Sequence, residues 1–211
     1  MKRDDLHVSD RSARLGHMTD SAKEDLQRYL QTGRDALLWK LDGLSEYDMR
    51  RPMTPTGTNL LGLVKHLTAV ELGYFGWTFD RPFREAVPWA EEGEDPHADL
   101  WATADESTEY IVGLYRQIWE HSDRTIAELP LDATGVVPHW PRERATVTLH
   151  RIVVHVIADM DRHAGHADIL RELIDGSVGL TLGNENMPSD EAAFWADHRA
   201  RVEEHARRFQ S

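Results

Sequence analysis

The feature that most restricts the fold of this chain is a helical repeat of apolar residues that recurs in four long segments. Apolar side chains return every three or four residues over about 21–44, 58–79 and 103–129, and again in a segment that follows residue 146 and ends near Asp175. This period is typical of helices that bury one face, and no segment has a convincing strand alternation. The sequence therefore predicts an all-α protein whose four helices form a bundle.

Local residue signals indicate where these helices begin and end. Ser21 and Glu24 have the spacing of a capping box, which predicts a helix start at Ser21. Pro52 and Gly57 break the chain before the second helix, and Gly176 is suited to cap the fourth.

The chain divides into three parts along its length. Residues 1–19 are polar and are expected to form an N-terminal arm, while 20–176 form the bundle. Residues 177–211 contain a loop and an amphipathic segment, which we expect to be an extra C-terminal helix packed on the bundle.

The composition excludes several classes of function. The chain has a net charge of −13, which argues against nucleic acid as a partner because phosphate binding needs a basic face. No apolar run reaches the roughly 18 residues of a membrane span, and the first residues lack the apolar core of a signal peptide. We therefore expect a cytoplasmic protein with a small-molecule substrate and no membrane partner. Bundles of this kind commonly pair through helix faces, so a homodimer is one expected state.

The fourth helix carries a polar stripe on what should be a buried face. With His155 placed at zero on a helical wheel, His166 lies near 20°, Asp159 near 40° and His163 near 80°. Three apolar residues share this arc: Ile152, Leu170 and Leu173. Burial of such polar groups costs several kcal/mol unless each finds a partner, so the stripe needs an explanation.

Two explanations fit the spacing of these residues. In the second helix, His66 shares a face with residues that are expected in the core, including Val70, Tyr74 and Trp77. Two imidazoles and a carboxylate that converge from neighbouring helices can hold a divalent metal and leave coordination positions open. The same groups can also form a buried hydrogen-bonded network without a metal. Spacing alone does not choose between these alternatives.

The residues of both helices resemble a known superfamily. The pairing of "LVKHLTAVELGYF" with "HVIADMDRHAGHADILRELIDG" is similar to the DinB-like metal-binding four-helix bundles. The branch it resembles most contains actinobacterial mycothiol-dependent S-transferases and maleylpyruvate isomerases. The resemblance covers Ser21 to Gly176 and implies a metal held by His66, Asp159 and His163.

Asp159 stands where many members of this superfamily have histidine. Both Asp159 and His155 are therefore kept as candidates for the third ligand, and the metal can be zinc, nickel or iron. His155 and His166 otherwise suit hydrogen bonds that orient the ligands.

The resemblance implies an enzyme that uses this metal to activate a low-molecular-weight thiol of the mycothiol type. The thiolate would attack a small electrophile, in an S-transferase or isomerase reaction. The absence of cysteine from the chain fits a sulfur that is brought by a cofactor. Two alternatives stay open, namely a metal-dependent hydrolase of a small molecule and a non-enzymatic accessory or stress protein.

Three further features each have two interpretations. Glu71 follows His66 by about one and a half turns and is either a general base or an ordinary surface glutamate. Trp77 and Trp140 either line a pocket mouth or anchor loops. His139 precedes the fourth helix, in a segment that either contacts an anionic ligand or is a solvated loop.

Overall fold

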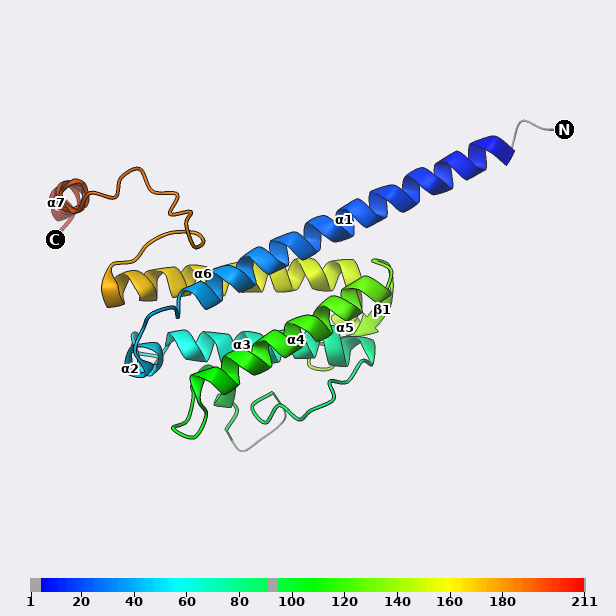
Figure 1. The fold of residues 1–211 in the computed structure, drawn as a ribbon, viewed down its shortest axis with the longest axis horizontal. Coiled ribbons are helices and arrows are strands. Elements are labelled where there is room, and N and C mark those ends of the chain that lie inside the picture. Colours follow the sequence, from blue (N-terminus) through cyan, green and yellow to red (C-terminus); the bar gives the residue numbers. More distant parts are fainter. Residues whose placement is uncertain (1–4, 91–94, 211) are drawn as a thin grey trace.

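The computed structural model describes residues 5–90 and 95–210, with side chains described from Ser21 onward. The described chain is an all-α bundle, as predicted. Its four long helices are α1 (Asp5–Trp39), α3 (Leu60–Glu71), α4 (Thr108–Glu128) and α6 (Leu149–Asp175), and they lie alongside one another in Figure 1. α1 packs on α6 and α3 packs on α4, while α3 also contacts α6.

Three of the four helices begin at a polar cap. The side chains of Asn59, Ser107 and Thr148 each accept a hydrogen bond from the backbone N–H three residues later in the chain. Each cap thereby pairs an N–H group that has no partner within the helix. Gly176 ends α6 with φ of 79°, the left-handed conformation that glycine adopts without strain, so this predicted cap is confirmed.

The core fills the space between the helices. Val64 and Leu67 of α3 and Ile152 and Val156 of α6 are all fully buried, and they belong to one hydrophobic core cluster. Leu173 differs from the sequence prediction, because it is 64% exposed in the last turn of α6, where the bundle no longer covers it.

α3 does not end at Glu71 but continues in a different helical form. A π-helical turn, η1 (Leu72–Gly76), is followed by a 3₁₀ turn, η2 (Trp77–Phe79), so the predicted end near Phe79 is confirmed. Glycines in this stretch weaken the α-helical preference, and the hydroxyl of Thr78 donates to the carbonyl of Gly73. A π-turn rotates the following side chains, and Trp77 is 40% exposed rather than in the core.

The first helix ends earlier than predicted, and a second, short helix follows it. α1 ends at Trp39 rather than near Leu44, because the chain turns there and Gly43 has φ of 74°. A five-residue helix, α2 (Glu46–Arg50), follows and is capped by the hydroxyl of Ser45.

The segment predicted as a loop before α6 contains a small sheet. β1 (Thr134–Val136) pairs antiparallel with β2 (Thr146–Thr148), and α5 (Arg142–Ala145) lies between them. Three-residue strands are too short to give a detectable alternation, so the sequence did not reveal them. Gly135 lets this sheet approach η2, since a Cβ there would overlap the carbonyl of Thr78.

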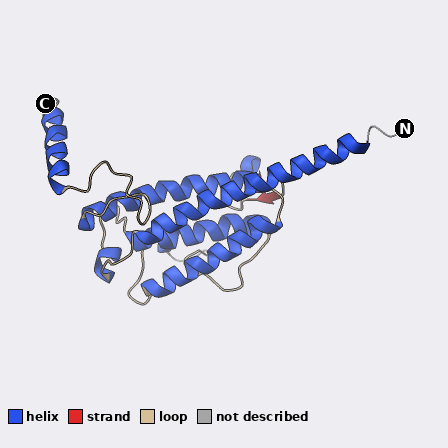
Figure 2. Ribbon diagram, turned by 45° about the horizontal axis from the view of Figure 1, so that its top comes forward, coloured by secondary structure: helices blue, strands red, loops and turns tan. Residues whose placement is uncertain are grey.

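Both ends of the chain differ from what the sequence predicted, which was an N-terminal arm and a C-terminal helix packed on the bundle. α1 begins at Asp5, so Ser21 lies within it, and residues 1–4 of the expected arm lie outside the described residues. α7 (Ala192–Arg207) has no buried residue and projects from the bundle in Figures 1 and 2. We therefore do not observe the expected burial of this C-terminal helix.

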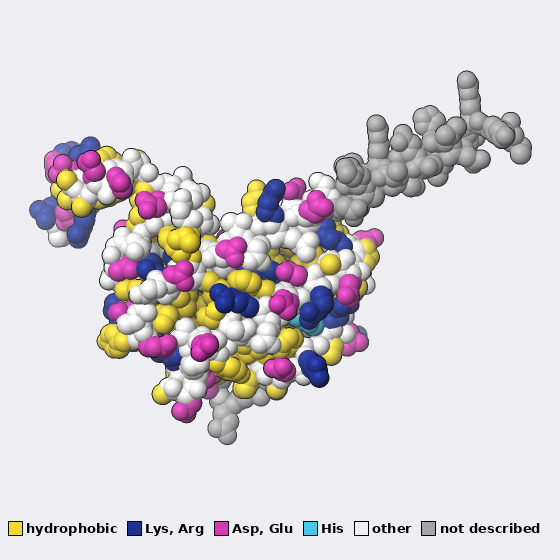
Figure 3. Space-filling model, in the orientation of Figure 1, with side chains coloured by type: hydrophobic (Ala, Val, Ile, Leu, Met, Phe, Trp, Pro, Cys, Tyr) yellow, Lys and Arg dark blue, Asp and Glu magenta, His cyan; other side chains and the backbone are white. Residues whose placement is uncertain are grey.

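Acidic and basic side chains are interspersed over the face of the molecule drawn in Figure 3. Among the described residues, no helix combines the length and the apolar character that crossing a bilayer requires.

Candidate metal centre

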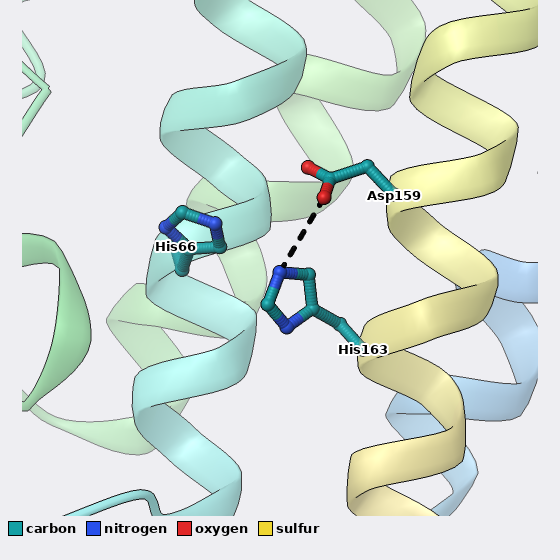
Figure 4. A group of neighbouring side chains, drawn as sticks. All are labelled: His66, Asp159 and His163. Carbon is teal, nitrogen blue, oxygen red and sulfur yellow. Dashed lines mark ion pairs between the residues drawn. The ribbon is translucent and has the colours of Figure 1, made fainter. Parts of the chain in front are cut away.

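The structure brings together the three residues that the resemblance assigned to a metal. His66 comes from α3, and Asp159 and His163 lie one turn apart on α6. One ligand atom from each residue can be chosen so that all three lie within 4.8 Å of one another. Figure 4 shows the three side chains pointing toward a common space between the two helices. These three side chains form a group that can hold a metal ion.

His163, on α6, makes no hydrogen bond to the neighbouring residues that the structure describes. Nε2 of His163 lies 3.6 Å from Oδ1 of Asp159, which is too long for a hydrogen bond. Nδ1 of His163 is buried and has no hydrogen-bond partner within the described part of the chain. His163 and Asp159 are therefore not joined by a hydrogen bond, as they would be in a tightly paired His–Asp network.

The environment of His163 keeps its imidazole neutral. Burial lowers the pKa of His163 below its usual value, the neighbouring His66 lowers it further, and Asp159 opposes both effects. The two rings meet edge to face, with centroids 4.8 Å apart. A neutral ring keeps a lone pair, which is the form that binds a metal.

The orientation of His66 is fixed by a residue that the sequence analysis did not find. Nδ1 of His66 lies 2.7 Å from Oδ2 of Asp99, a hydrogen bond in which the ring N–H donates to the carboxylate. The other nitrogen, Nε2, is thereby left with its lone pair. A carboxylate that holds the far nitrogen of a histidine is the usual partner of a metal-binding imidazole.

Asp99 reaches the site because its loop is anchored on α3. It lies in the 3₁₀ turn η3 (Ala98–Leu100), within the long connection before α4. Gly62 leaves room for the carbonyl of Leu100, which accepts a hydrogen bond of 3.3 Å from the amide of Asn59. The ammonium of Lys65 also donates to the carbonyl of Trp101 at 2.8 Å. No local sequence signal marks Asp99, because its position depends on these long-range contacts.

The candidate centre lies between two cavities. The larger, of about 320 Å³, is lined by His66 and Asp159 together with Ala69, Val70, Gly73, Tyr74, Trp77, His139 and His155. The smaller, of about 210 Å³, is lined by His163 and His166 together with Thr56, Gly57, Thr58, Asn59, Gly62, Leu63 and Leu100. Small molecules can therefore approach the three side chains from two sides.

The remaining predicted residues lie in different places. His155 hydrogen-bonds to Tyr74 with a distance of 3.0 Å, and it is Asp159 rather than His155 that completes the cluster. His166 is exposed, and its ring centroid lies 5.4 Å from that of His163. Neither donates to a candidate ligand, so their expected orienting role finds no hydrogen bond to support it.

Glu71 does not lie at the candidate centre, which corrects its proposed role as a general base. It is fully buried, and its two carboxylate oxygens accept hydrogen bonds of 2.9 and 2.6 Å from the guanidinium of Arg34. Five residues after His66 on a helix correspond to a rotation of about 140°, which turns Glu71 toward α1.

Comparison with known proteins identifies a family for most of the chain. A family model described as mycothiol-S-transferase matches residues 25–176. The matched range contains His66, Asp159, His163 and Asp99 and ends at the cap of α6. No curated protein matches the chain.

Proposed function

Because the chain belongs to the mycothiol-S-transferase family, we propose that it is a metal-dependent enzyme that joins the sulfur of a mycothiol-type thiol to a small electrophile. The observation that carries this proposal is the convergence of His66, Asp159 and His163 inside the matched range. The cavities on both sides of this cluster give access to two reactants.

The donor set fits a catalytic divalent cation. Two imidazoles and one carboxylate are the ligands of many hydrolytic zinc sites and of non-haem iron sites, in which the remaining positions stay open. Asp159 supplies a negative charge that a cation offsets, and Nε2 of His163, which is too far from Asp159 for a hydrogen bond, gains a partner. Zinc, nickel and iron are all compatible with these donors.

Bound there, such an ion would lower the pKa of a coordinated thiol, so that the thiol is available as a thiolate at neutral pH. Asp99 holds the ring of His66 in the orientation that presents Nε2. The aromatic wall of the larger cavity, which includes Tyr74 and Trp77, suits an apolar electrophile. The chain contains no cysteine, so the reacting sulfur has to come from a co-substrate.

The test combines metal analysis with a two-substrate assay. We expect purified protein reconstituted with zinc, nickel or iron to bind about one ion per chain, as measured by elemental analysis. The loaded protein should then conjugate mycothiol to a fluorogenic haloalkane, with the product identified by mass spectrometry. Protein that binds none of the three metals would overturn the proposal.

Two other outcomes of this assay point to the alternatives. Hydrolysis of an electrophile at the same rate without thiol would indicate a hydrolase. Stoichiometric metal without thiol binding or turnover would indicate an accessory protein. The expected homodimer and cytoplasmic location stay predictions, of which the first is checked by sedimentation of the loaded protein.

Asp99 gives a prediction that does not depend on the reaction. Replacing Asp99 with alanine removes the acceptor that orients His66, and we expect the affinity for zinc to fall about 10- to 100-fold. Competition with a chromogenic chelator measures this affinity. Asp105→Ala is the matched control, because Asp105 is an exposed carboxylate in the same connection. Equal affinities for both variants would show that Asp99 has no such role.

A further inference from the structure

A cluster of hydrogen bonds surrounds one phenol in the wall of the larger cavity. The hydroxyl of Tyr74, on η1, lies 3.0 Å from Nε2 of His155 on α6. The indole Nε1 of Trp140 donates to the same oxygen at 3.2 Å, and Nε2 of His139 lies 3.4 Å from it. Three segments distant in sequence therefore meet at this oxygen.

Counting protons assigns opposite roles to the two histidines. An indole N–H can only donate, so Trp140 occupies one lone pair of the Tyr74 oxygen. The phenol has one proton to donate and one lone pair left. One histidine must therefore accept the O–H proton at Nε2, and the other must donate its Nε2–H. A series of hydrogen bonds in which each group accepts from one neighbour and donates to the next is the arrangement that conducts a proton.

The exposure of these side chains gives the series of hydrogen bonds a direction, from the cavity to solvent. Tyr74 is 9% exposed and His155 is half-buried, whereas His139 is exposed to solvent. All three line the cavity that His66 and Asp159 also line. An electrophile that fills this cavity displaces water, which can then no longer carry protons out of it. The hydrogen-bonded side chains still offer a path for protons to solvent.

We propose that His155, Tyr74 and His139 form a proton relay that carries the thiol proton from the cavity to solvent. This inference rests on the proposed function, which requires a thiol to lose its proton before sulfur attacks carbon. The relay carries the thiol proton to solvent, so no residue of the candidate metal centre has to accept and keep it.

The transfer balances at every atom. The S–H proton passes to Nδ1 of His155, whose Nε2–H proton passes to the oxygen of Tyr74. The phenol releases its own proton to Nε2 of His139, and Nδ1 of His139 releases a proton to water. With a haloalkane, the carbon–sulfur bond forms as the carbon–halogen bond breaks, and halide leaves. The rings regain their starting tautomers by exchange with solvent.

The phenol is suited to pass a proton rather than to hold a charge. Burial raises the pKa of Tyr74 above its usual value, the hydrogen bond from Trp140 opposes this, and the nearby Asp159 raises it further. Tyr74 therefore stays protonated at neutral pH.

The first test uses metal-free protein and does not depend on turnover. Ring ¹⁵N shifts of the histidines, measured at a pH where both rings are neutral, show which nitrogen carries each proton. We expect a protonated Nε2 in His155 and an unprotonated Nε2 in His139, as the direction of the relay requires. Tyr74→Phe keeps the ring but removes the hydroxyl, and both sets of shifts should change. Identical tautomers in the two rings, the reverse assignment, or shifts unaffected by Tyr74→Phe would overturn the relay.

The second test measures how fast the thiol proton reaches solvent. Zinc-loaded protein is filled with a non-reactive haloalkane analogue and mixed with mycothiol in weak buffer, and a pH indicator dye follows proton release by stopped flow. We expect His139→Ala and Tyr74→Phe to slow this release about 100-fold without changing the number of protons released. Added imidazole should restore the rate of His139→Ala, because it replaces the missing exposed ring.

The control for rescue is His150→Ala, which removes an exposed histidine elsewhere on α6. Its rate of proton release should match that of the wild type with and without imidazole. Wild-type rates in His139→Ala, or slow rates that imidazole leaves unchanged, would contradict the relay. Wild-type protein that releases no proton with mycothiol would contradict the proposed function instead, and the ring shifts would still decide the hydrogen-bond arrangement.

Discussion

Replacing His163 with alanine is expected to abolish stoichiometric metal binding and to leave the bundle folded. Two ligands remain, and we expect the affinity for zinc to fall by more than about 100-fold, because losing a ligand costs more than losing a residue that only orients one. S-transfer should fall with the loss of the metal. The fold should persist because α6 is held by fully buried side chains, including Ile152 and Val156.

Elemental analysis and circular dichroism of the same samples measure both parts of this prediction. The free energy of unfolding of the metal-free variant should lie within about 1 kcal/mol of that of the metal-free wild type, since His163 makes no hydrogen bond to the residues that the structure describes. His150→Ala again serves as the control and should bind about one ion per chain. A metal-free wild type together with a large loss of stability in His163→Ala would instead support a buried His–Asp network.

The second large effect is expected at the buried ion pair between α1 and α3. Arg34 is 1% exposed, and its guanidinium binds both carboxylate oxygens of Glu71 and one oxygen of Asp123. Burial lowers the pKa of Arg34, but the carboxylates of Glu71 and Asp123 outweigh it and raise the pKa above its usual value. Removal of one partner leaves a buried charge without compensation.

Arg34→Met and Glu71→Leu should each lower the free energy of unfolding by about 3–5 kcal/mol, which urea denaturation measures. The double variant Arg34→Met/Glu71→Leu should be more stable than either single variant, because apolar side chains replace both charges. Arg207→Met is the matched control, since its pair with Glu203 on α7 is exposed and its loss should change stability by less than about 1 kcal/mol. Losses below 1 kcal/mol in both single variants would show that solvent already reaches the pair.

The number and the type of the long helices could be predicted from the sequence, because helical periodicity and caps are local properties. The i, i+4 spacing of Asp159 and His163 fixes their common face for the same reason, and Gly176 marks the end of α6. The family resemblance added His66 as the third member of the site. These residues meet in the structure as that reasoning expected.

Tertiary structure alone decided the rest of the site. Asp99 reaches His66 across 33 positions of the sequence, and it does so only because its loop is anchored on α3. The face of Glu71 was open to two interpretations until α1 supplied Arg34 as its partner. Local spacing restricts which residues share a helix face, whereas the partner of each face depends on how separate segments pack. Packing free energy is summed over the whole core, so no single stretch of sequence contains it.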